Sequence, residues 1–316
     1  MSNYVTVEHL TKRFGDLVAV DDLSFTVKEG EIFGFLGPNG AGKSTTLNII
    51  TTLIDSDKGK IMIGGYNLEH HEKKVKSLIG VVPQNIALFP TLTAYENVSF
   101  FASLYGMSGG DLKESVNKAL GFVGMLEHSK TKAVKMSGGM QRRLNIACGI
   151  CHKPKLIIMD EPTVGVDAQS RELIMDSIRT LQTNGATVIY TSHYMPEVQD
   201  ICDRIAIIDN GRLAAIGTKE ELLEVVTDFK TIFIETDKVD ESHNGLVDSL
   251  KSIHDVRHVM LDTERSQIRI DVPLSFGNVT PILKVIMDKG MVVNKLNSEA
   301  PNLETTFLAL TGRELN

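Results

Sequence analysis

The sequence predicts an α/β fold with a parallel sheet, followed by a smaller α+β domain, and three observations lead to this prediction. Short, continuous apolar runs alternate with stretches of helical spacing, which is typical of strands buried on both faces of a parallel sheet. A glycine-rich stretch at 37–45 joins one such strand to a helix. Beyond residue 228 the predicted elements follow the order β-α-β-β-α-β. At 316 residues the chain is long enough for two domains, which we place at 1–227 and 228–316.

The N-terminal part predicts an antiparallel β subdomain that leads into the parallel sheet. Residues 4–10 alternate between apolar and polar side chains, as a half-buried strand does, and 20–27 form a second strand. A turn at Glu29 and Gly30 leads into the buried strand 32–36. A short strand at 60–63 is followed by Gly64 and Gly65, and a further strand at 78–83 ends at Gln84.

The middle of the chain, at about 88–152, predicts a helical insertion in the α/β core. Apolar residues recur there at helical spacing, and glycines separate the helices. The α/β pattern then resumes with a strand at 155–159, a helix at 168–183, a strand at 186–191 and a helix near 195–201. A hairpin joins 205–208 to 213–216 across Asn210 and Gly211, a pair typical of a type I′ turn.

The C-terminal part predicts a small α+β (ferredoxin-like) domain after a helix near 218–226. We expect a strand at 230–236, a helix at 241–253, a hairpin of 256–261 and 267–272, a helix at 280–289 and a strand at 291–296. This is the ferredoxin-like order. The tail, at 302–311, predicts a final short helix. The domain contains no nucleotide motif, so it is either a passive appendage or a surface that biases dimerisation.

Composition excludes several classes of function. Apolar residues make up 42% and charged residues 23%, as in an ordinary globular protein. A net charge of −7 supplies no basic field to attract nucleic acid, so we expect no nucleic-acid partner. Three cysteines make no disulfide framework, and we expect no signal peptide. No apolar run approaches the ~18 residues that span a bilayer, so a membrane role requires a partner.

The stretch at 37–45 fits the phosphate-binding loop pattern G-x-x-x-x-G-K-[ST]. It lies between a buried strand and a helix, which is the context that the motif requires, and it consists of Gly37, Pro38, Asn39, Gly40, Ala41, Gly42, Lys43, Ser44 and Thr45. Its glycines let backbone N–H groups surround a phosphate, and the helix N-terminus adds partial positive charge. We expect Lys43 to reach the terminal phosphates and the Ser44 hydroxyl to hold Mg²⁺.

The strand at 155–159 ends in two acids, Asp160 and Glu161. In a nucleotide site Asp160 would hold Mg²⁺, and Glu161 would orient and deprotonate the attacking water. Two acids after one apolar strand are, taken alone, better explained as an ordinary strand end. The stretch at 136–143, which precedes this strand, therefore decides the interpretation.

Residues 136–143 read Met-Ser-Gly-Gly-Met-Gln-Arg-Arg. Here the sequence resembles the ATP-binding-cassette (ABC) ATPases, whose signature is usually written L-S-G-G-Q and is followed by a basic helix. The resemblance covers about residues 4–226, and the motifs occur in the family's order. It implies a phosphate-loop ATPase core with an antiparallel β subdomain and a helical insertion, which binds ATP and Mg²⁺.

The resemblance also implies roles for residues outside the two motifs already described. Phe14 would stack on adenine, although a place in the hydrophobic core is an open alternative. Gln84 would touch Mg²⁺ or water, as the Q-loop residue. Asp167 would be the aspartate of the D-loop, which reads V-G-V-D at 164–167 instead of the commoner S-A-L-D. His193 would be the switch histidine at the γ-phosphate.

The signature departs from the family pattern at Met136 and Met140, which replace Leu and Gln, while Ser137, Gly138 and Gly139 remain. The helix N-terminus can therefore still meet a γ-phosphate through N–H groups and the serine hydroxyl. In this family the signature completes the site of a second cassette. The resemblance thus implies a head-to-tail dimer with two ATP molecules between the subunits.

The variant signature, the D-loop and the extra C-terminal domain look like bacterial ABC-2-type exporters, a group that includes antibiotic-resistance ATPases. This likeness implies an ATPase subunit at the cytoplasmic face of the membrane, paired with separate permease subunits. Two alternatives are a soluble cassette protein acting on ribosomes or DNA, and a regulatory module that hardly hydrolyses. The single cassette and the absence of heptads disfavour the first, and Glu161 and His193 disfavour the second.

The segment 85–97 is more apolar than a connecting loop requires, since it contains Leu88, Phe89, Leu92 and Tyr95. Part of it must be local core. The remainder is expected to form a groove between the α/β core and the helical insertion that receives a cytoplasmic helix of the membrane subunit.

Overall fold

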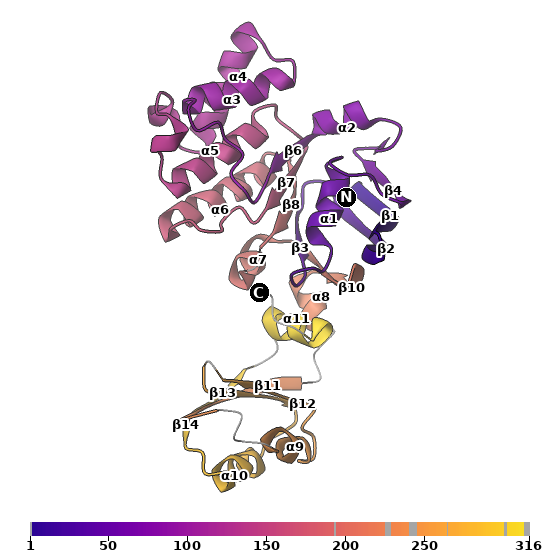
Figure 1. The fold of residues 1–316 in the computed structure, drawn as a ribbon, viewed down its shortest axis with the longest axis vertical. Coiled ribbons are helices and arrows are strands. Elements are labelled where there is room, and N and C mark those ends of the chain that lie inside the picture. The colour runs from indigo at the N-terminus through magenta and orange to yellow at the C-terminus, as the bar shows by residue number, and fades with distance from the viewer. Residues whose placement is uncertain are drawn as a thin grey trace. The chain divides into compact units, whose positions relative to one another are not determined.

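The computed structural model describes residues 2–192, 194–224, 229–239, 245–263, 265–299 and 302–312. The chain divides into two compact units, one running up to Lys219 and the other from Glu220 to Gly312. Figure 1 shows the helices and strands of each unit.

A six-stranded sheet forms the centre of the first unit, in the order β10-β9-β3-β8-β7-β6. Its strands are β3 (Ile32–Leu36), β6 (Ile79–Val82), β7 (Leu156–Asp160), β8 (Thr187–Thr191), β9 (Arg204–Asp209) and β10 (Arg212–Gly217). All pairs are parallel except the hairpin of β9 and β10. Every residue of β3 and β8 is buried, which confirms the expectation that continuous apolar runs form strands covered on both faces.

A second, antiparallel sheet packs beside the first, in the order β2-β1-β4-β5. It consists of β1 (Asn3–Phe14), β2 (Leu17–Lys28), β4 (Lys58–Ile63) and β5 (Tyr66–Asn67). One hydrophobic cluster includes residues of both sheets. Within it Phe25 of β2 stacks on Phe33 of β3, with ring centroids 5.7 Å apart. The predicted β subdomain is thus present, and its first two strands extend beyond the predicted ends.

Helices complete the first unit: α1 (Lys43–Ile50), α2 (Glu72–Leu78), α3 (Ala94–Leu104), α4 (Gly109–Phe122), α5 (Gly138–Ile150), α6 (Ala168–Thr183) and α7 (Met195–Ile201). Two short 3-10 helices, η1 (Leu126–His128) and η2 (Ala133–Lys135), precede α5. Helices α3 to α5 are the predicted helical insertion. A capping box of Thr93 and Glu96 begins α3.

The second unit contains the sheet β12-β13-β11-β14, in which all neighbours are antiparallel. The boundary between the units falls after the first residue of α8 (Lys219–Glu224). The further elements are β11 (Phe229–Thr236), α9 (Leu246–Lys251), β12 (His258–Asp262), β13 (Gln267–Pro273), α10 (Thr280–Asp288), β14 (Val293–Glu299) and α11 (Leu303–Thr311). The β-α-β-β-α-β order is ferredoxin-like, as expected. Residues 240–244, the start of the predicted helix 241–253, lie outside the described residues.

Two negative expectations can be compared with this fold. Among the residues that the structure describes, no helix combines the length and apolar character that crossing a membrane requires. The three cysteines are free, as the composition predicted.

Candidate functional site

The loop between β3 and α1 requires glycine at two close approaches of backbone to backbone. A Cβ on Gly37 would lie 2.4 Å from the carbonyl oxygen of Ile208, and one on Gly42 would lie 2.4 Å from that of Ala19. Gly42 also has φ of 98°, a conformation that residues with a Cβ rarely adopt. The exposed residues of the loop are Asn39, Gly40 and Ser44. The motif therefore folds into a compact loop that begins a helix.

The turn between β9 and β10 braces this loop. Gly211 donates its N–H to the carbonyl oxygen of Ala41 at 3.0 Å, and Asp21 donates to that of Gly211 at 2.9 Å. Asn210 and Gly211 have φ of 48° and 76°, so both central residues are left-handed, as a type I′ turn requires. The hairpin predicted from Asn210-Gly211 thus also supports the phosphate-binding loop.

Lys43 is the buried cation of the loop, with 8% of its surface exposed. Its ammonium donates to the carbonyl oxygens of Gly37 and Pro38, the latter at 3.1 Å. Burial lowers the pKa of Lys43, while the negative charges of Glu161 and Asp160 act to raise it. The ammonium is therefore held inside the loop by backbone dipoles and by carboxylates of β7 and the residue after it.

Asp160 and Glu161 stand at the C-terminal end of β7, and both are fixed by neighbours. The Thr191 hydroxyl donates to Asp160 Oδ1 at 2.7 Å, and Glu161 N–H donates to Thr191 Oγ1 at 3.0 Å. Gln84, which follows β6, donates from Nε2 to Glu161 Oε2 at 2.7 Å. The structure thus brings together Lys43, Gln84 and the two acids, which lie far apart in the sequence.

The signature residues form the N-terminus of α5. Ser137 is the N-cap, and its hydroxyl accepts the N–H of Met140 at 3.3 Å. Ser137 and Gly138 are exposed, whereas Gly139 is buried. A Cβ on Gly139 would lie 2.1 Å from Ser170 Oγ, so only glycine permits this approach of α5 to α6.

Asp167 of the D-loop caps α6 and contacts the same serine. Ser170 donates its N–H to Asp167 Oδ1 at 2.8 Å and its hydroxyl to Oδ2 at 2.9 Å. These hydrogen bonds, with the backbone N–H of Ser170 contributing most, lower the pKa of Asp167. The signature and the D-loop therefore meet at Ser170 within one chain.

Sequence reasoning missed the contact between the signature helix and the Q-loop. Arg142, 4% exposed, donates to the carbonyl oxygens of Pro83 at 2.9 Å and Gln84 at 2.7 Å. Asn145, one turn later on α5, accepts the N–H of Ala87 at 3.2 Å. Burial lowers the pKa of the Arg142 guanidinium, and the carboxylates of Glu161 and Asp160 act to raise it. Only the basic helix after the signature hinted at such a residue.

Phe14 lies on the surface, at the end of β1. Its side chain is 49% exposed, and the Lys12 ammonium lies 5.5 Å from the ring centroid. This exposure rules out the hydrophobic-core interpretation that the sequence left open. Stacking of Phe14 on adenine remains a prediction.

His193 lies outside the described residues, so its predicted role at the γ-phosphate remains a prediction as well. The residues on either side are described. Tyr194 donates its N–H to the hydroxyl of Ser192 at 3.0 Å.

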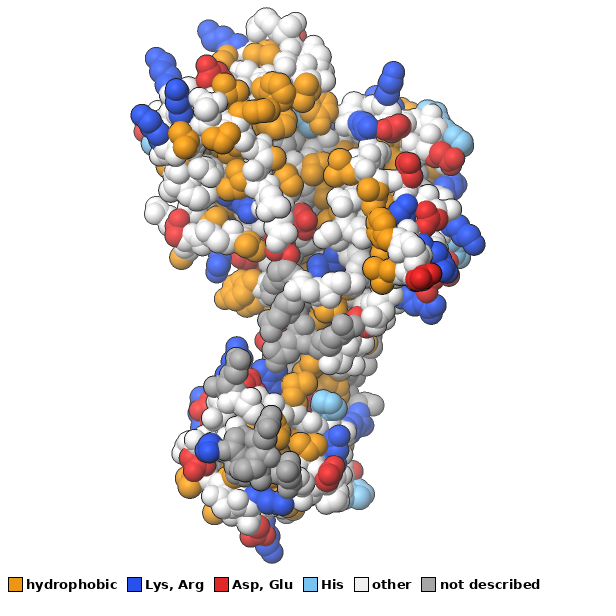
Figure 2. Space-filling model, in the orientation of Figure 1, with side chains coloured by type: hydrophobic (Ala, Val, Ile, Leu, Met, Phe, Trp, Pro, Cys, Tyr) orange, Lys and Arg blue, Asp and Glu red, His pale blue; other side chains and the backbone are white. Residues whose placement is uncertain are grey.

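An exposed hydrophobic surface lies on the helical insertion, and Figure 2 shows such side chains gathered over α3. The rings of Phe89 and Phe100 are 4.7 Å apart, and these residues are 42% and 41% exposed. Leu104, 65% exposed, lies one helical turn after Phe100. Leu104, Tyr105 and Val81 also line a cavity of about 530 Å³ beside α2. Of the other apolar residues in 85–97, Leu88, Leu92 and Tyr95 are half-buried.

Comparison with known proteins agrees with this geometry. A family model described as ABC transporter matches residues 20–164. The linearmycin resistance ATP-binding protein of Bacillus subtilis is 43% identical over 310 residues, covering 98% of each chain. A Nod factor export ATP-binding protein of Sinorhizobium fredii is 34% identical and covers 98% of this chain and 87% of its own.

Solved structures show the same cassette. A dimeric ATP-binding cassette in a post-hydrolysis state, bound to ADP and Pi, matches with a TM-score of 0.62 and 29% identity, covering 68% of this chain and 98% of its own. The ATP-binding subunit of an ABC transporter matches with a TM-score of 0.65 and 26% identity, covering 71% and 93%. The chain belongs to the ABC transporter family, as an ATP-binding subunit that hydrolyses ATP.

Proposed function

We propose that this chain powers an exporter as a head-to-tail dimer of cassettes bound to separate membrane subunits. The observation that carries the proposal is the exposure of Ser137 and Gly138 at the start of α5, a helix of 13 residues. In Figure 1, α5 and α1 lie on either side of strands β6, β7 and β8. The exposed signature is therefore available to the phosphate-binding loop of a second copy.

In the proposed reaction Glu161 accepts a proton from the water that attacks the γ-phosphate. Gln84 holds the Glu161 carboxylate through its Nε2 donor, so the base is oriented before water arrives. Lys43 exchanges its bonds to loop carbonyls for the terminal phosphates, where its charge is better compensated. Phe14 stacks on the adenine, and Asp167 and His193 complete the site from the D-loop and the switch position.

The residues also fit a magnesium ion. The Ser44 hydroxyl, the Asp160 carboxylate and the Gln84 amide oxygen supply hard oxygen ligands, which Mg²⁺ prefers. Among the described residues no group of three His, Cys, Asp or Glu could hold a metal. Mg²⁺ usually takes few protein ligands together with substrate phosphates and water. When bound, the ion would neutralise charge on the β- and γ-phosphates.

The exposed surface formed by Phe89, Phe100, Leu104 and Tyr105 supports docking to a membrane subunit. Exposed apolar groups of this kind mark interaction sites in soluble domains. The names of the relatives, which concern linearmycin resistance and Nod factor export, support an exporter. We place the chain at the cytoplasmic face of the membrane as part of this proposal. We propose that a cytoplasmic helix of the membrane subunit binds this surface, because amphipathic helices commonly place apolar side chains against exposed apolar surfaces of their partners.

Dimerisation of Glu161→Gln with ATP and Mg²⁺ tests the head-to-tail arrangement. Light scattering should show a monomer without nucleotide and a dimer with it, because unhydrolysed ATP bridges the two subunits. Ser137→Glu, added to this variant, should bind ATP and remain monomeric, since a carboxylate would repel the partner's γ-phosphate. A Glu161→Gln protein that binds ATP yet stays monomeric would contradict the proposal.

Copurification tests the docking surface. Leu104→Glu should keep basal ATPase activity and lose association with its membrane subunit. Leu126→Glu is the matched control, because Leu126 is 49% exposed on η1 and should leave the complex intact. Equal copurification of both variants would place docking elsewhere.

A further inference from the structure

Glu197 on α7 is a buried carboxylate that none of the roles above requires. It is 4% exposed, and its Oε2 accepts hydrogen bonds from three side-chain hydroxyls. The donors are Thr163 at 2.7 Å, Tyr190 at 2.6 Å and Ser192 at 3.0 Å. A carboxylate oxygen, which only accepts, suits a site that presents three hydroxyl donors.

The second oxygen of Glu197 faces a cation. Arg171 Nε on α6 lies 3.2 Å from Glu197 Oε1, as an ion pair outside hydrogen-bond geometry. The same guanidinium lies 5.1 Å from the ring centroid of Tyr194. A buried carboxylate is costly unless it is paired and hydrogen-bonded, and here it is both.

The partners of Glu197 are Thr163 in the loop between β7 and α6, Arg171 on α6, Tyr190 on β8 and Ser192 directly after β8. The loop between β7 and α6 carries Glu161 and Asp167. Thr163 follows Glu161 by two positions. Ser192 directly precedes His193 in the sequence, and Ser192 Oγ also accepts the N–H of Tyr194. Arg171 lies in the first turn of α6, and Asp167 caps this helix. The backbone N–H of Arg171 donates to the Asp167 carbonyl oxygen at 2.9 Å.

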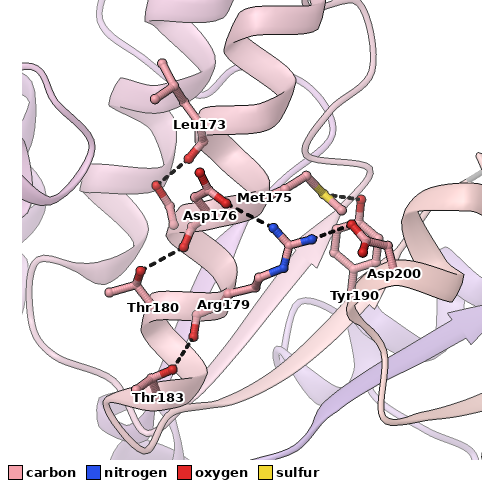
Figure 3. A network of polar contacts seen from close by, with 9 residues as sticks. Leu173, Met175, Asp176, Arg179, Thr180, Thr183, Tyr190 and Asp200 are labelled. Carbon is pink, nitrogen blue, oxygen red and sulfur yellow. Dashed lines mark hydrogen bonds and ion pairs between the residues drawn. The ribbon is translucent and has the colours of Figure 1, made fainter.

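A rigid frame surrounds this carboxylate. The hydroxyl oxygen of Tyr190, which has no exposed surface, also lies 3.9 Å from Met175 Sδ on α6. Figure 3 shows the Arg179 guanidinium between Asp176 of α6 and Asp200 of α7. Helices α6 and α7 are therefore linked by two ion pairs, Arg171–Glu197 and Arg179–Asp200, which hold Glu197 in place.

We infer that Glu197 is a positioning residue, which fixes the loop of Glu161 and Asp167 relative to Ser192 for the attack on the γ-phosphate. It acts through Thr163, Ser192 and Arg171 and does not itself contact ATP. This inference rests on the proposed roles of that loop. Because Phe14 and the phosphate-binding loop belong to other elements, Glu197 should govern the rate of the chemical step and leave nucleotide binding unchanged.

Steady-state kinetics of full-length Glu197→Gln, measured well below its melting temperature, tests the inference. We expect kcat to fall about 10-fold to 100-fold, because small displacements of catalytic groups have effects of this size, with KM for ATP nearly unchanged. Glu172→Gln is the matched control, since Glu172 is exposed and follows Arg171 directly on α6. A merely structural role would lower the melting temperature and leave kcat of the folded protein intact.

Tyr190→Phe provides the second variant, should Glu197→Gln fail to fold. It removes one hydroxyl donor from the carboxylate and keeps the buried ring, so a smaller loss of kcat at constant KM is expected. Folded variants with wild-type kcat, or with a rise in KM alone, would overturn the inference. Glu161→Gln is assayed in parallel to separate failure of the proposed function from failure of this inference. If Glu161→Gln retains turnover, the proposed catalytic roles are wrong. If Glu161→Gln loses turnover but Glu197→Gln retains it, only the positioning role of Glu197 is wrong.

Discussion

The two units of the chain both pack helices against a sheet around an apolar core. They differ in how many charged side chains they bury. The first unit buries Glu31, Lys43, Arg142, Glu161 and Glu197. Among the described residues of the second unit, Arg269 alone is a buried charged residue, at 9% exposed, and the other buried polar side chains are threonines.

This difference indicates which unit does chemistry. Burying charge costs free energy of folding, and hydroxyls with partners are much less costly. In the second unit Thr231 donates to Asp271 Oδ1 at 2.8 Å, an arrangement that a sheet can contain without any catalytic purpose. In the first unit, four of the five buried charged residues contact loops that carry the predicted catalytic residues. The C-terminal unit should therefore act through its surface.

Glu161→Gln should have the largest effect and is the strongest test of the comparison. Turnover should fall about 10²-fold to 10⁴-fold, the usual contribution of a general base, while ATP binding is retained. Glu31→Gln is the matched control: Glu31 is 5% exposed but precedes β3 at the end opposite the phosphate-binding loop. It should cost stability and leave kcat intact. Phosphate release and calorimetric titration with ATP measure both quantities.

Arg142→Lys should have the next largest effect. Lysine keeps the positive charge but cannot donate to the carbonyl oxygens of Pro83 and Gln84 as a two-pronged guanidinium does. We expect Gln84 to shift and turnover to fall about 10-fold to 100-fold. In contrast, Arg143 donates to the Val123 carbonyl oxygen, so Arg143→Lys should stay near the wild-type rate. Similar rates for both variants would show that charge alone matters.

Phe14→Ala should weaken ATP binding by about 1–3 kcal/mol, by analogy with the stacking of bases on aromatic side chains. The melting temperature of the nucleotide-free protein should hardly change, because the ring is exposed. Leu17→Ala, on the same hairpin and 66% exposed, should leave affinity intact. Unchanged affinity in Phe14→Ala would assign the adenine to another contact.

Truncation after Asp228 should have the smallest effect on nucleotide binding. ATP affinity should stay within about twofold, as expected for sites that share no partners. ATP-dependent dimerisation should weaken if the C-terminal unit packs against the C-terminal unit of the second copy. Analytical ultracentrifugation measures the dimerisation directly. Unchanged dimerisation and cooperativity would leave the unit a passive appendage.

Much of the fold could be predicted because the apolar runs of the parallel sheet are continuous and the glycines of its loops are spaced in a recognisable pattern. The elements that were missed have weaker signals. Helix α2 buries only Val75, so no apolar stripe marks it in the sequence. Strand β5 has two residues, and β1 continues to Phe14 through side chains that do not alternate cleanly.

The motifs located the candidate site, but its supports could not be predicted. The partners of Arg142 lie 58 and 59 residues away, and Glu197 meets Thr163 across 34 residues. Nothing in the local sequence distinguishes such a buried arginine or glutamate from a solvated one, because burial is decided by the tertiary fold. Phe14 illustrates the same limit, since only its exposure excluded the core.

The backbone of Glu161 has a consequence for how this protein can evolve. Its φ of 49° lies in the left-handed region, which costs a residue with a Cβ roughly 1–2 kcal/mol. Gly and Asn adopt this conformation most readily, yet neither places a carboxylate where Gln84 now donates. Substitutions that relax this position would therefore make the cassette more durable and inactive. Selection for thermal tolerance is therefore expected to act at positions other than this residue.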